Sequence, residues 1–348
     1  RALSSAASDV YKRQGLTYLM GILMWYGSTK GYDLTVFPTA QMMYPAAGVI
    51  IGLFLAHKGE KILPAGFFIT VLATTGVLIV LALLSVFLPV NDLNIAGMTM
   101  SVYNLISQYI LIIGSIVALV FLAVAGNEKR AAAGLTRQNW KSAVLIVLAF
   151  VGIYIVRTVV SVAVQGVSDG SGMQYVKEWA AMFKNPMMWL NIAALPINYF
   201  FVFIAFFGEE YGWRYYLQPV LQKRFGLRAG VIILGVVWGL WHIPDDLFYY
   251  TQTSGIQMIF AQQITCISLG IFFAYAYMKT QNIWVPVCLH YLNNNLIPII
   301  SGTFSADVLE NQTVSWKDLP VALVLNGLCF GFFLLADVFK KKEVQEEE

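Results

Sequence analysis

Long uninterrupted apolar runs constrain the fold of this chain more than any other feature. A helix needs about 18 or more apolar residues to cross roughly 30 Å of hydrocarbon, and stretches such as 62–89 and 142–166 exceed that length. The sequence does not show the alternation over ten-residue segments that marks a membrane β-barrel. The runs therefore predict an all-α, polytopic integral membrane protein folded as a helical bundle.

The amino-acid composition is typical of an integral membrane protein. Of the 348 residues, 58% are hydrophobic and 12% are charged, a far more apolar balance than that of soluble domains. The net charge of +3 does not indicate nucleic acid as a partner, because the basic residues stand at helix ends. We predict about ten membrane-spanning helices, over residues 15–27, 36–56, 62–89, 103–126, 142–166, 187–208, 229–248, 258–278, 283–300 and 318–339.

The loops between these helices predict the orientation. Basic residues fall in alternate loops, for example Lys58 and Lys61, whereas the intervening loops are acidic and include Asp245 and Asp246. By the positive-inside rule, the basic loops face the cytoplasm. We therefore expect a multi-pass protein of the cell membrane with both termini cytoplasmic. Arg157, late in its helix, is expected to extend toward the outer interface.

Charged, imidazole and amide side chains gather in three stretches of the predicted membrane helices. Ionisable residues are costly within a bilayer and suggest function by default. All three stretches follow the loop 167–186. They contain Glu209, Glu210 and Arg214, then Trp238 and His242, then His290 and Asn294.

Helical spacing separates the two adjacent glutamates. Neighbouring residues point about 100° apart on a helix, so Glu209 and Glu210 do not face the same place equally. Glu210 stands four residues before Arg214, which is the favoured order for a helical ion pair. We predict that Glu210 and Arg214 form a structural pair, and that Glu209 alone faces the histidines.

The same spacing groups the remaining residues. Trp238 precedes His242 by four positions, so the indole is expected to form a wall of the site beside the imidazole. His290 and Asn294 are also four apart and share one helical face. Two donors on one face are suited to stabilising a single developing negative charge.

Two chemistries are compatible with this set. In the first, which requires no cofactor, Glu209 acts as general base on a water with help from His242, while His290 and Asn294 donate to the oxyanion. In the second, Glu209, His242 and His290 ligate a zinc ion that activates the water. The first is preferred, because His290 shares its helical face with Asn294, which suits two donors to one oxyanion, whereas a metal-ligating His normally seeks an acceptor for its other N–H group. The common HExxH arrangement is absent from the sequence.

Simpler explanations exist for each residue taken alone. A buried His is often only a hydrogen-bonded core residue, Glu209 could be a solvated helix end, and neighbouring Asn residues could join packed helices. Two other functions also fit a membrane bundle with buried Glu and His. One is a non-proteolytic immunity or scaffold protein, and the other is a proton-coupled transporter. The combination of residues at these spacings favours the hydrolytic reading.

The three stretches resemble the motifs of the CPBP (CAAX protease and bacteriocin-processing) family, also called the ABI domain. The family pattern is Glu-Glu-x-x-x-Arg, then Phe-x-x-x-His, then His-x-x-x-Asn, and the resemblance covers roughly residues 187–300. It implies an all-helical intramembrane endopeptidase with a cavity open to the cytosol. By the resemblance, Glu209 and His242 activate water, and His290 and Asn294 stabilise the transition state.

The resemblance also suggests partners and a division of the chain. It implies a peptide or protein substrate, with lipidated and bacteriocin-like substrates included, cleaved at the cytoplasmic membrane face. Trp238 stands where the family usually has Phe. The predicted division lists a non-native or truncated leader over 1–14, N-terminal membrane helices of unassigned role over 15–180, a CAAX-protease-like core over 187–300, and a last membrane helix with a charged cytoplasmic tail over 301–348.

Overall fold

The computed structural model describes residues 2–95, 98–168, 170, 173–301 and 310–340. Most of these residues are helical, and β1 (Leu93–Ile95) pairs antiparallel with β2 (Met98–Met100). The predicted all-α membrane bundle is therefore confirmed.

The helical elements follow one another with short connections. In chain order they are α1 (Ala2–Lys30), α2 (Val36–Ala56), α3 (Ala65–Phe87), α4 (Val102–Val124), α5 (Asn127–Ala132), α6 (Trp140–Ser168), α7 (Met173–Met182), α8 (Pro186–Glu210), the π-helix η1 (Tyr211–Leu217), α9 (Gln218–Phe225), α10 (Leu227–Trp241), α11 (Ile243–Phe248), α12 (Gly255–Thr280), α13 (Trp284–Ser301), α15 (Asp318–Cys329), and the 3₁₀ turns η2 (Gly331–Leu335) and η3 (Asp337–Phe339).

The predicted count of ten spanning helices is not confirmed. Within the described residues, seven helical segments are long and apolar enough to cross a membrane, and each matches one predicted span. The predicted last span fails because α15 has only 12 residues, about 18 Å of helix, before the chain breaks into 3₁₀ turns. The predicted spans in α1 and α13 lie in helices that do not meet the same criterion, and α13 carries four polar residues between His290 and Asn295.

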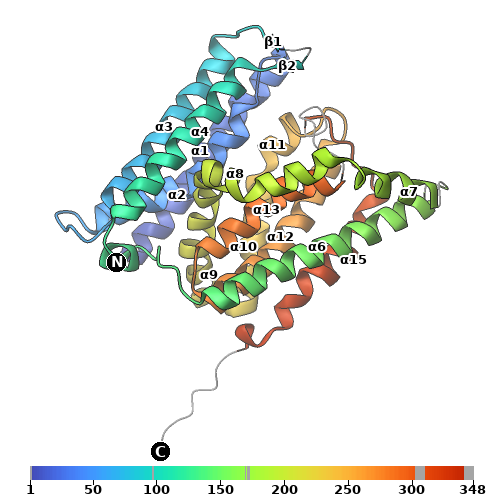
Figure 1. Ribbon diagram of the computed structural model, residues 1–348. Coiled ribbons are helices and arrows are strands. Elements are labelled where there is room, and N and C mark those ends of the chain that lie inside the picture. Colours follow the sequence, from blue (N-terminus) through green and yellow to red (C-terminus); the bar gives the residue numbers. More distant parts are fainter. Residues whose placement is uncertain (1, 96–97, 169, 171–172, 302–309, 341–348) are drawn as a thin grey trace, which may run out of the picture.

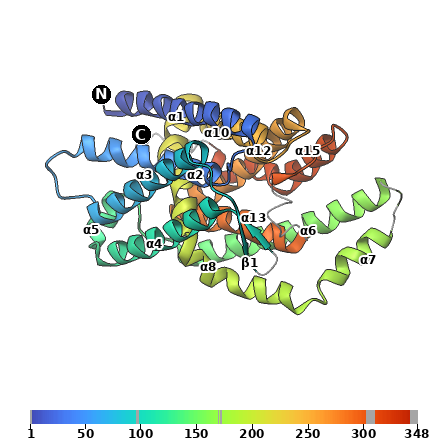
Figure 2. The same ribbon diagram turned by 90° about the horizontal axis from the view of Figure 1, so that it is seen from above.

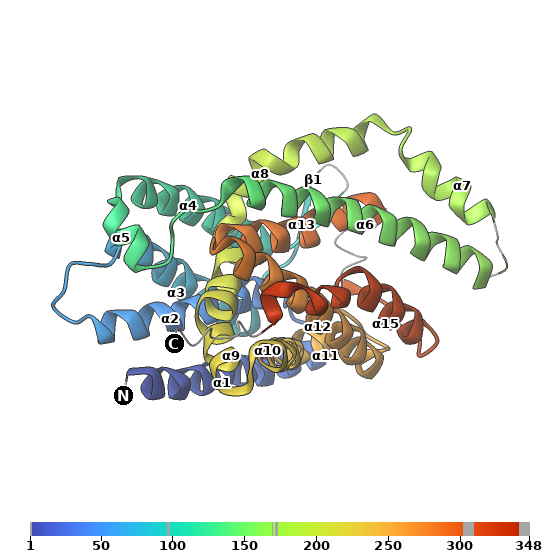
Figure 3. The same ribbon diagram turned by 90° about the horizontal axis from the view of Figure 1, so that it is seen from below.

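The helices of the bundle are arranged in three neighbouring groups. Helices α1 to α4 form one flank, and α7 lies at the opposite edge (Figures 1 and 2). Helices α8, α10, α12 and α13 lie between them, with α6 and α15 beside this central group (Figure 3). The central group carries all three predicted motif stretches.

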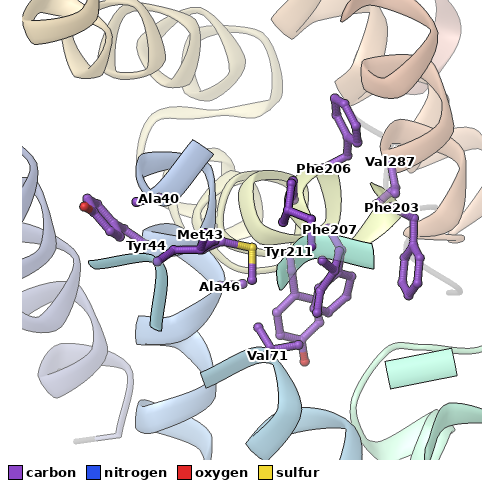
Figure 4. Close-up of a cluster of buried hydrophobic side chains, with 14 of the residues drawn as sticks. Ala40, Met43, Tyr44, Ala46, Val71, Phe203, Phe206, Phe207, Tyr211 and Val287 are labelled. Carbon is purple, nitrogen blue, oxygen red and sulfur yellow. The ribbon is translucent and has the colours of Figure 1, made fainter. Parts of the chain in front are cut away.

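Close packing of α2 against α8 and η1 fixes the helix that carries the two glutamates. Figure 4 shows apolar side chains of α2, α3, α8, η1 and α13 meeting in one buried cluster. Two glycines allow the approach. A Cβ at Gly208 would lie 2.4 Å from the carbonyl oxygen of Met42, and a Cβ at Gly212 would lie 2.2 Å from Cβ of Pro45. Small residues at such positions let membrane helices pack backbone to backbone.

A helical hairpin brings two of the motif stretches together. Gly226 ends α9 with a φ of +89°, a conformation that glycine adopts at little cost. Helix α10 then returns along α9, so closely that a Cβ at Gly230 would lie 2.6 Å from the backbone nitrogen of Gln222. Glu209 precedes the turn by 17 residues (226 − 209) and His242 follows it by 16 (242 − 226). The antiparallel arms therefore place both residues at the same level of the bundle.

One sequence-based placement is wrong. Asp245 and Asp246 do not lie in an outer loop but in α11, where they are 2% and 0% exposed. The chain turns inward because α11 follows α10 directly and α1 packs on it, so closely that a Cβ at Gly21 would lie 2.9 Å from Cγ of Pro244. Arg157 Nε donates to Asn326 Oδ1 of α15 at 2.7 Å, and its extension toward the outer interface stays a prediction.

Candidate active site

The glutamates lie where a regular helix becomes a π-helix. Helix α8 ends at Glu210, and the next seven residues, Tyr211–Leu217, form η1. Such π-turns are rare and are frequent at functional sites. Glu209 and Glu210 are 2% and 0% exposed. Two adjacent carboxylates buried within a bundle each need a partner, because an unpaired buried charge is costly.

Glu210 has two partners. Its Oε2 lies 2.9 Å from Arg214 Nε, and both side chains are fully buried, so the predicted pair is confirmed. Its Oε1 lies 2.9 Å from His290 Nδ1. The prediction that Glu209 alone faces the histidines is therefore wrong. The reason is that one carboxylate oxygen of Glu210 contacts Arg214 in η1, and the other contacts His290 in α13.

Aromatic rings cover the cation of this pair. The guanidinium carbon of Arg214 lies 5.0 Å from the ring centre of Trp238 and 5.5 Å from that of Phe273. Cations are attracted to ring faces, and Arg is well suited to such stacking. Arg214, Glu210 and His290 therefore form a connected series across η1, α8 and α13.

Glu209 is held by two indoles. Its Oε2 accepts from Trp238 Nε1 at 2.8 Å and lies 3.4 Å from Trp213 Nε1. Its Oε1 faces His290 Nε2 at 3.9 Å, beyond hydrogen-bond length. Hydrogen bonds from N–H donors stabilise the ionised carboxylate. One oxygen is therefore fixed by tryptophans, and the other is directed at the histidine.

Trp238 also fixes His242, the cap residue at the end of α10. Nδ1 of His242 lies 2.8 Å from the carbonyl oxygen of Trp238. A carbonyl only accepts, so Nδ1 carries the hydrogen, and in the neutral ring Nε2 keeps its lone pair. No hydrogen bond joins Glu209 to His242 in the described parts of the chain. Trp238 connects them, through its indole on one side and its carbonyl on the other.

His290 is oriented in the same way. Its Nδ1 donates to Glu210, which leaves Nε2 directed toward Glu209 Oε1. The rings of Phe206, Trp238 and Phe273 pack around it, with centre distances between 5.4 and 5.9 Å. Glu210 thus supplies an acceptor for the Nδ1–H group of His290.

Asn294 lies outside this buried group. It is exposed, one helical turn past His290, and its Oδ1 accepts from Asn293 Nδ2 at 2.8 Å. Among the residues described, its amide makes no hydrogen bond to Glu209, His242 or His290. The structure thus brings Glu209, Glu210, Arg214, Trp238, His242 and His290 together, and places Asn294 at their margin.

The arrangement does not fit the alternative zinc site. In the ranges that the structure describes, no three His, Cys, Asp or Glu side chains lie close enough together to hold a metal ion. The cysteines Cys266, Cys288 and Cys329 are free.

Sequence reasoning missed several members of the site. Trp213 follows Glu209 by four residues, the same spacing that indicated the Glu210–Arg214 pair, and this signal was sufficient to find it. Asp245 and Asp246 carry no comparable signal, since their burial depends on how α11 turns under α1.

These features define a polytopic helical membrane protein with a buried glutamate–histidine site. Residues 191–296, which include every residue of that site, match the family model described as type II CAAX prenyl endopeptidase Rce1-like. Over this region the chain is similar to CAAX prenyl endopeptidases.

A curated relative supports this placement at a distance. The CAAX prenyl protease 2 of Methanococcus maripaludis is 27% identical over 125 residues, which are 33% of this chain and 45% of that protein. The match thus spans less than half the length of the relative. No solved structure matches the chain.

Proposed function

We propose that this protein is an intramembrane endopeptidase that hydrolyses peptide bonds of polypeptides at the cytoplasmic membrane face. The observation that carries the proposal is the geometry around Glu209. One carboxylate oxygen is fixed by Trp238 and Trp213, and the other faces Nε2 of a histidine without a hydrogen bond, at 3.9 Å. A water at the side of these two atoms, rather than between them, can hydrogen-bond to both at about 2.8 Å.

In the proposed reaction, Glu209 removes a proton from a water molecule while Nε2 of His242 accepts from the same water. The resulting hydroxide attacks the carbonyl carbon of the scissile peptide bond. Because Nδ1 of His290 donates to Glu210, Nε2 can also donate only when the ring is an imidazolium. In that form His290, together with Asn294, donates hydrogen bonds to the oxyanion that forms, a contribution typically worth 10² to 10³ in rate for each donor. The carbon–nitrogen bond then breaks, and the proton passes from Glu209 to the leaving amine.

Glu210 and Arg214 support this reaction indirectly. The carboxylate of Glu210 holds Nδ1 of His290 and so directs Nε2 toward the reacting atoms. Partners of this kind fix the tautomer and the orientation of a functional His. Arg214 compensates the charge of Glu210 inside the bundle.

The substrate class follows from the relatives. The matched family model and the curated relative are both described as CAAX prenyl proteases. We accordingly propose a polypeptide substrate, with lipidated CAAX-type peptides as the first to test and bacteriocin-like peptides as the second. Both termini of the chain are proposed to be cytoplasmic, from the alternation of basic loops.

The test is cleavage by the purified protein in proteoliposomes, with lipidated and unlipidated forms of one peptide. Glu209→Gln is expected to fold and insert normally and to lose activity by about 10² to 10⁴, the usual cost of a missing general base. The matched control is Glu178→Gln, which changes an exposed glutamate of α7 and should keep full activity. Wild-type protein that cleaves neither peptide, or a Glu209→Gln variant with full activity, would contradict the proposal. Proton-driven uptake without cleavage would favour a transporter instead.

A further inference from the structure

Helix α6 reaches the site although it lies in the N-terminal part of the chain. Phe150 of α6 packs on Phe273 of α12 with ring centres 6.0 Å apart, and Phe273 contacts His290. Tyr154 lies one turn further along α6, is 5% exposed, and stacks near Phe150. A side chain from α6 therefore lies beside the helix that carries His290 and Asn294.

The hydroxyl of Tyr154 begins a directed series of hydrogen bonds. It donates to Oδ1 of Asn293. Because that oxygen faces the tyrosine, the amide nitrogen of Asn293 points the other way and donates to Oδ1 of Asn294 at 2.8 Å. Asn294 thus accepts with its oxygen, and in the described residues its own NH₂ group has no protein acceptor.

The direction of this series matters for the reaction. If the amide of Asn293 were turned over, its oxygen would face Asn294. The amide of Asn294 would then turn as well, and one of its two N–H donors would be taken by Asn293. A cation lies near the hydroxyl of Tyr154: the guanidinium carbon of Arg157 is 5.8 Å from the tyrosine ring centre. A neighbouring positive charge and a chain of polarised hydrogen bonds both favour donation by the hydroxyl. Arg157 is itself held by Asn326 of α15.

We propose that Tyr154 is a positioning residue for the hydrolytic reaction, acting through Asn293 to keep the NH₂ group of Asn294 free for the oxyanion. The inference rests on the proposed function, because it takes Asn294 as an oxyanion donor. It extends that function by assigning a role to α6, which lies outside the segment matched by the family model. Arg157 and Asn326 secure the far end of the series.

The experiment measures kcat, KM and thermal unfolding for a set of variants in detergent and proteoliposomes. Tyr154→Phe removes only the hydroxyl and should lower kcat by roughly 3- to 15-fold with KM unchanged, the loss expected for one hydrogen bond. Asn293→Asp keeps the acceptor for Tyr154 but cannot donate to Asn294, and should lower kcat at least as much. Asn294→Ala should cost about 10² to 10³.

The matched control is Tyr291→Phe. Tyr291 is a buried tyrosine of α13 whose hydroxyl donates to the carbonyl of Leu195 at 2.8 Å, away from Asn294. Removing the Tyr291 hydroxyl should lower the free energy of unfolding about as much as Tyr154→Phe does, and it should leave kcat unchanged. A purely structural role for Tyr154 would make the two variants behave alike.

A double variant provides the decisive measurement. If Tyr154 acts through Asn294, then Tyr154→Phe should have no further effect on kcat once Asn294 is Ala. An equal loss in both backgrounds, or a Tyr154→Phe variant with wild-type kcat, would overturn the positioning role. The comparison requires that the wild-type protein cleaves the peptide and that Asn294→Ala has a lower kcat. Inactive wild-type protein would instead refute the proposed function.

Discussion

Removing the charge of Glu210 should destabilise the protein without abolishing the acceptor that orients His290. In Glu210→Gln the amide oxygen still accepts from His290 Nδ1, but Arg214, which is fully buried, loses its counter-charge. Breaking a buried pair by removing one partner typically costs about 3 to 5 kcal/mol. Arg214→Gln should cost a similar amount, because it leaves Glu210 buried without its cation.

The double variant tests whether these costs are coupled. With Gln at both positions no uncompensated charge remains, so the loss of stability should be close to that of either single variant rather than their sum. The coupling energy is then about 3 to 5 kcal/mol. The assay is chemical unfolding in detergent for the four proteins, with cleavage measured in parallel. Glu210→Leu should be less active than Glu210→Gln, since it also removes the acceptor for His290.

An exposed pair provides the control. His57 and Glu60 are joined at 3.0 Å, but their side chains are 35% and 53% exposed, against 0% and 0% for Arg214 and Glu210. Surface pairs contribute about 0 to 1 kcal/mol, so Glu60→Gln should leave stability nearly unchanged. If the stability lost in the double variant equals the sum of the two single losses to within about 0.5 kcal/mol, Glu210 and Arg214 do not form a coupled buried pair.

Three further outcomes are expected. Single cysteines at the exposed positions 129 and 223 should react with impermeant reagents only from the cytoplasmic side, and a cysteine at position 94 only from outside; the reverse pattern would overturn the orientation. Cleavage should survive chelation of the purified protein, and a loss that added zinc restores would contradict the metal-free reaction. Asp246→Leu should raise stability by about 1 to 3 kcal/mol, because neither oxygen of this 0% exposed carboxyl group has a hydrogen-bond partner in the described residues; a lower unfolding midpoint would indicate that the carboxyl group is needed.

Much of the fold could be predicted because a bilayer demands long apolar helices. Seven of the predicted spans coincide with helices that meet the length and hydropathy requirement. The last predicted span could not be judged from hydropathy, since the break after Cys329 depends on backbone geometry rather than on apolar content. The orientation and the role of the leader 1–14 stay predictions.

The site was predictable where four-residue spacing governs the contacts. The Glu210–Arg214 pair and the partnership of Trp238 with His242 follow from that spacing alone. The contact of Glu210 with His290 does not, because it joins two helices 80 residues apart. The participation of Tyr154 was hidden for the same reason, since its partner lies 139 residues away.

The matched lengths of the two arms around Gly226 limit where the chain can gain or lose residues. One residue inserted within α9 or α10 would rotate the following stretch by about 100° and advance it by about 1.5 Å, which would turn Trp238 away from Glu209. An insertion at the turn itself leaves both arms in place, because exposed turns accept extra residues without disturbing the packed helices. Length differences among natural relatives are expected at this turn, and it is also the place where an epitope tag or a reporter domain could be added without loss of the site.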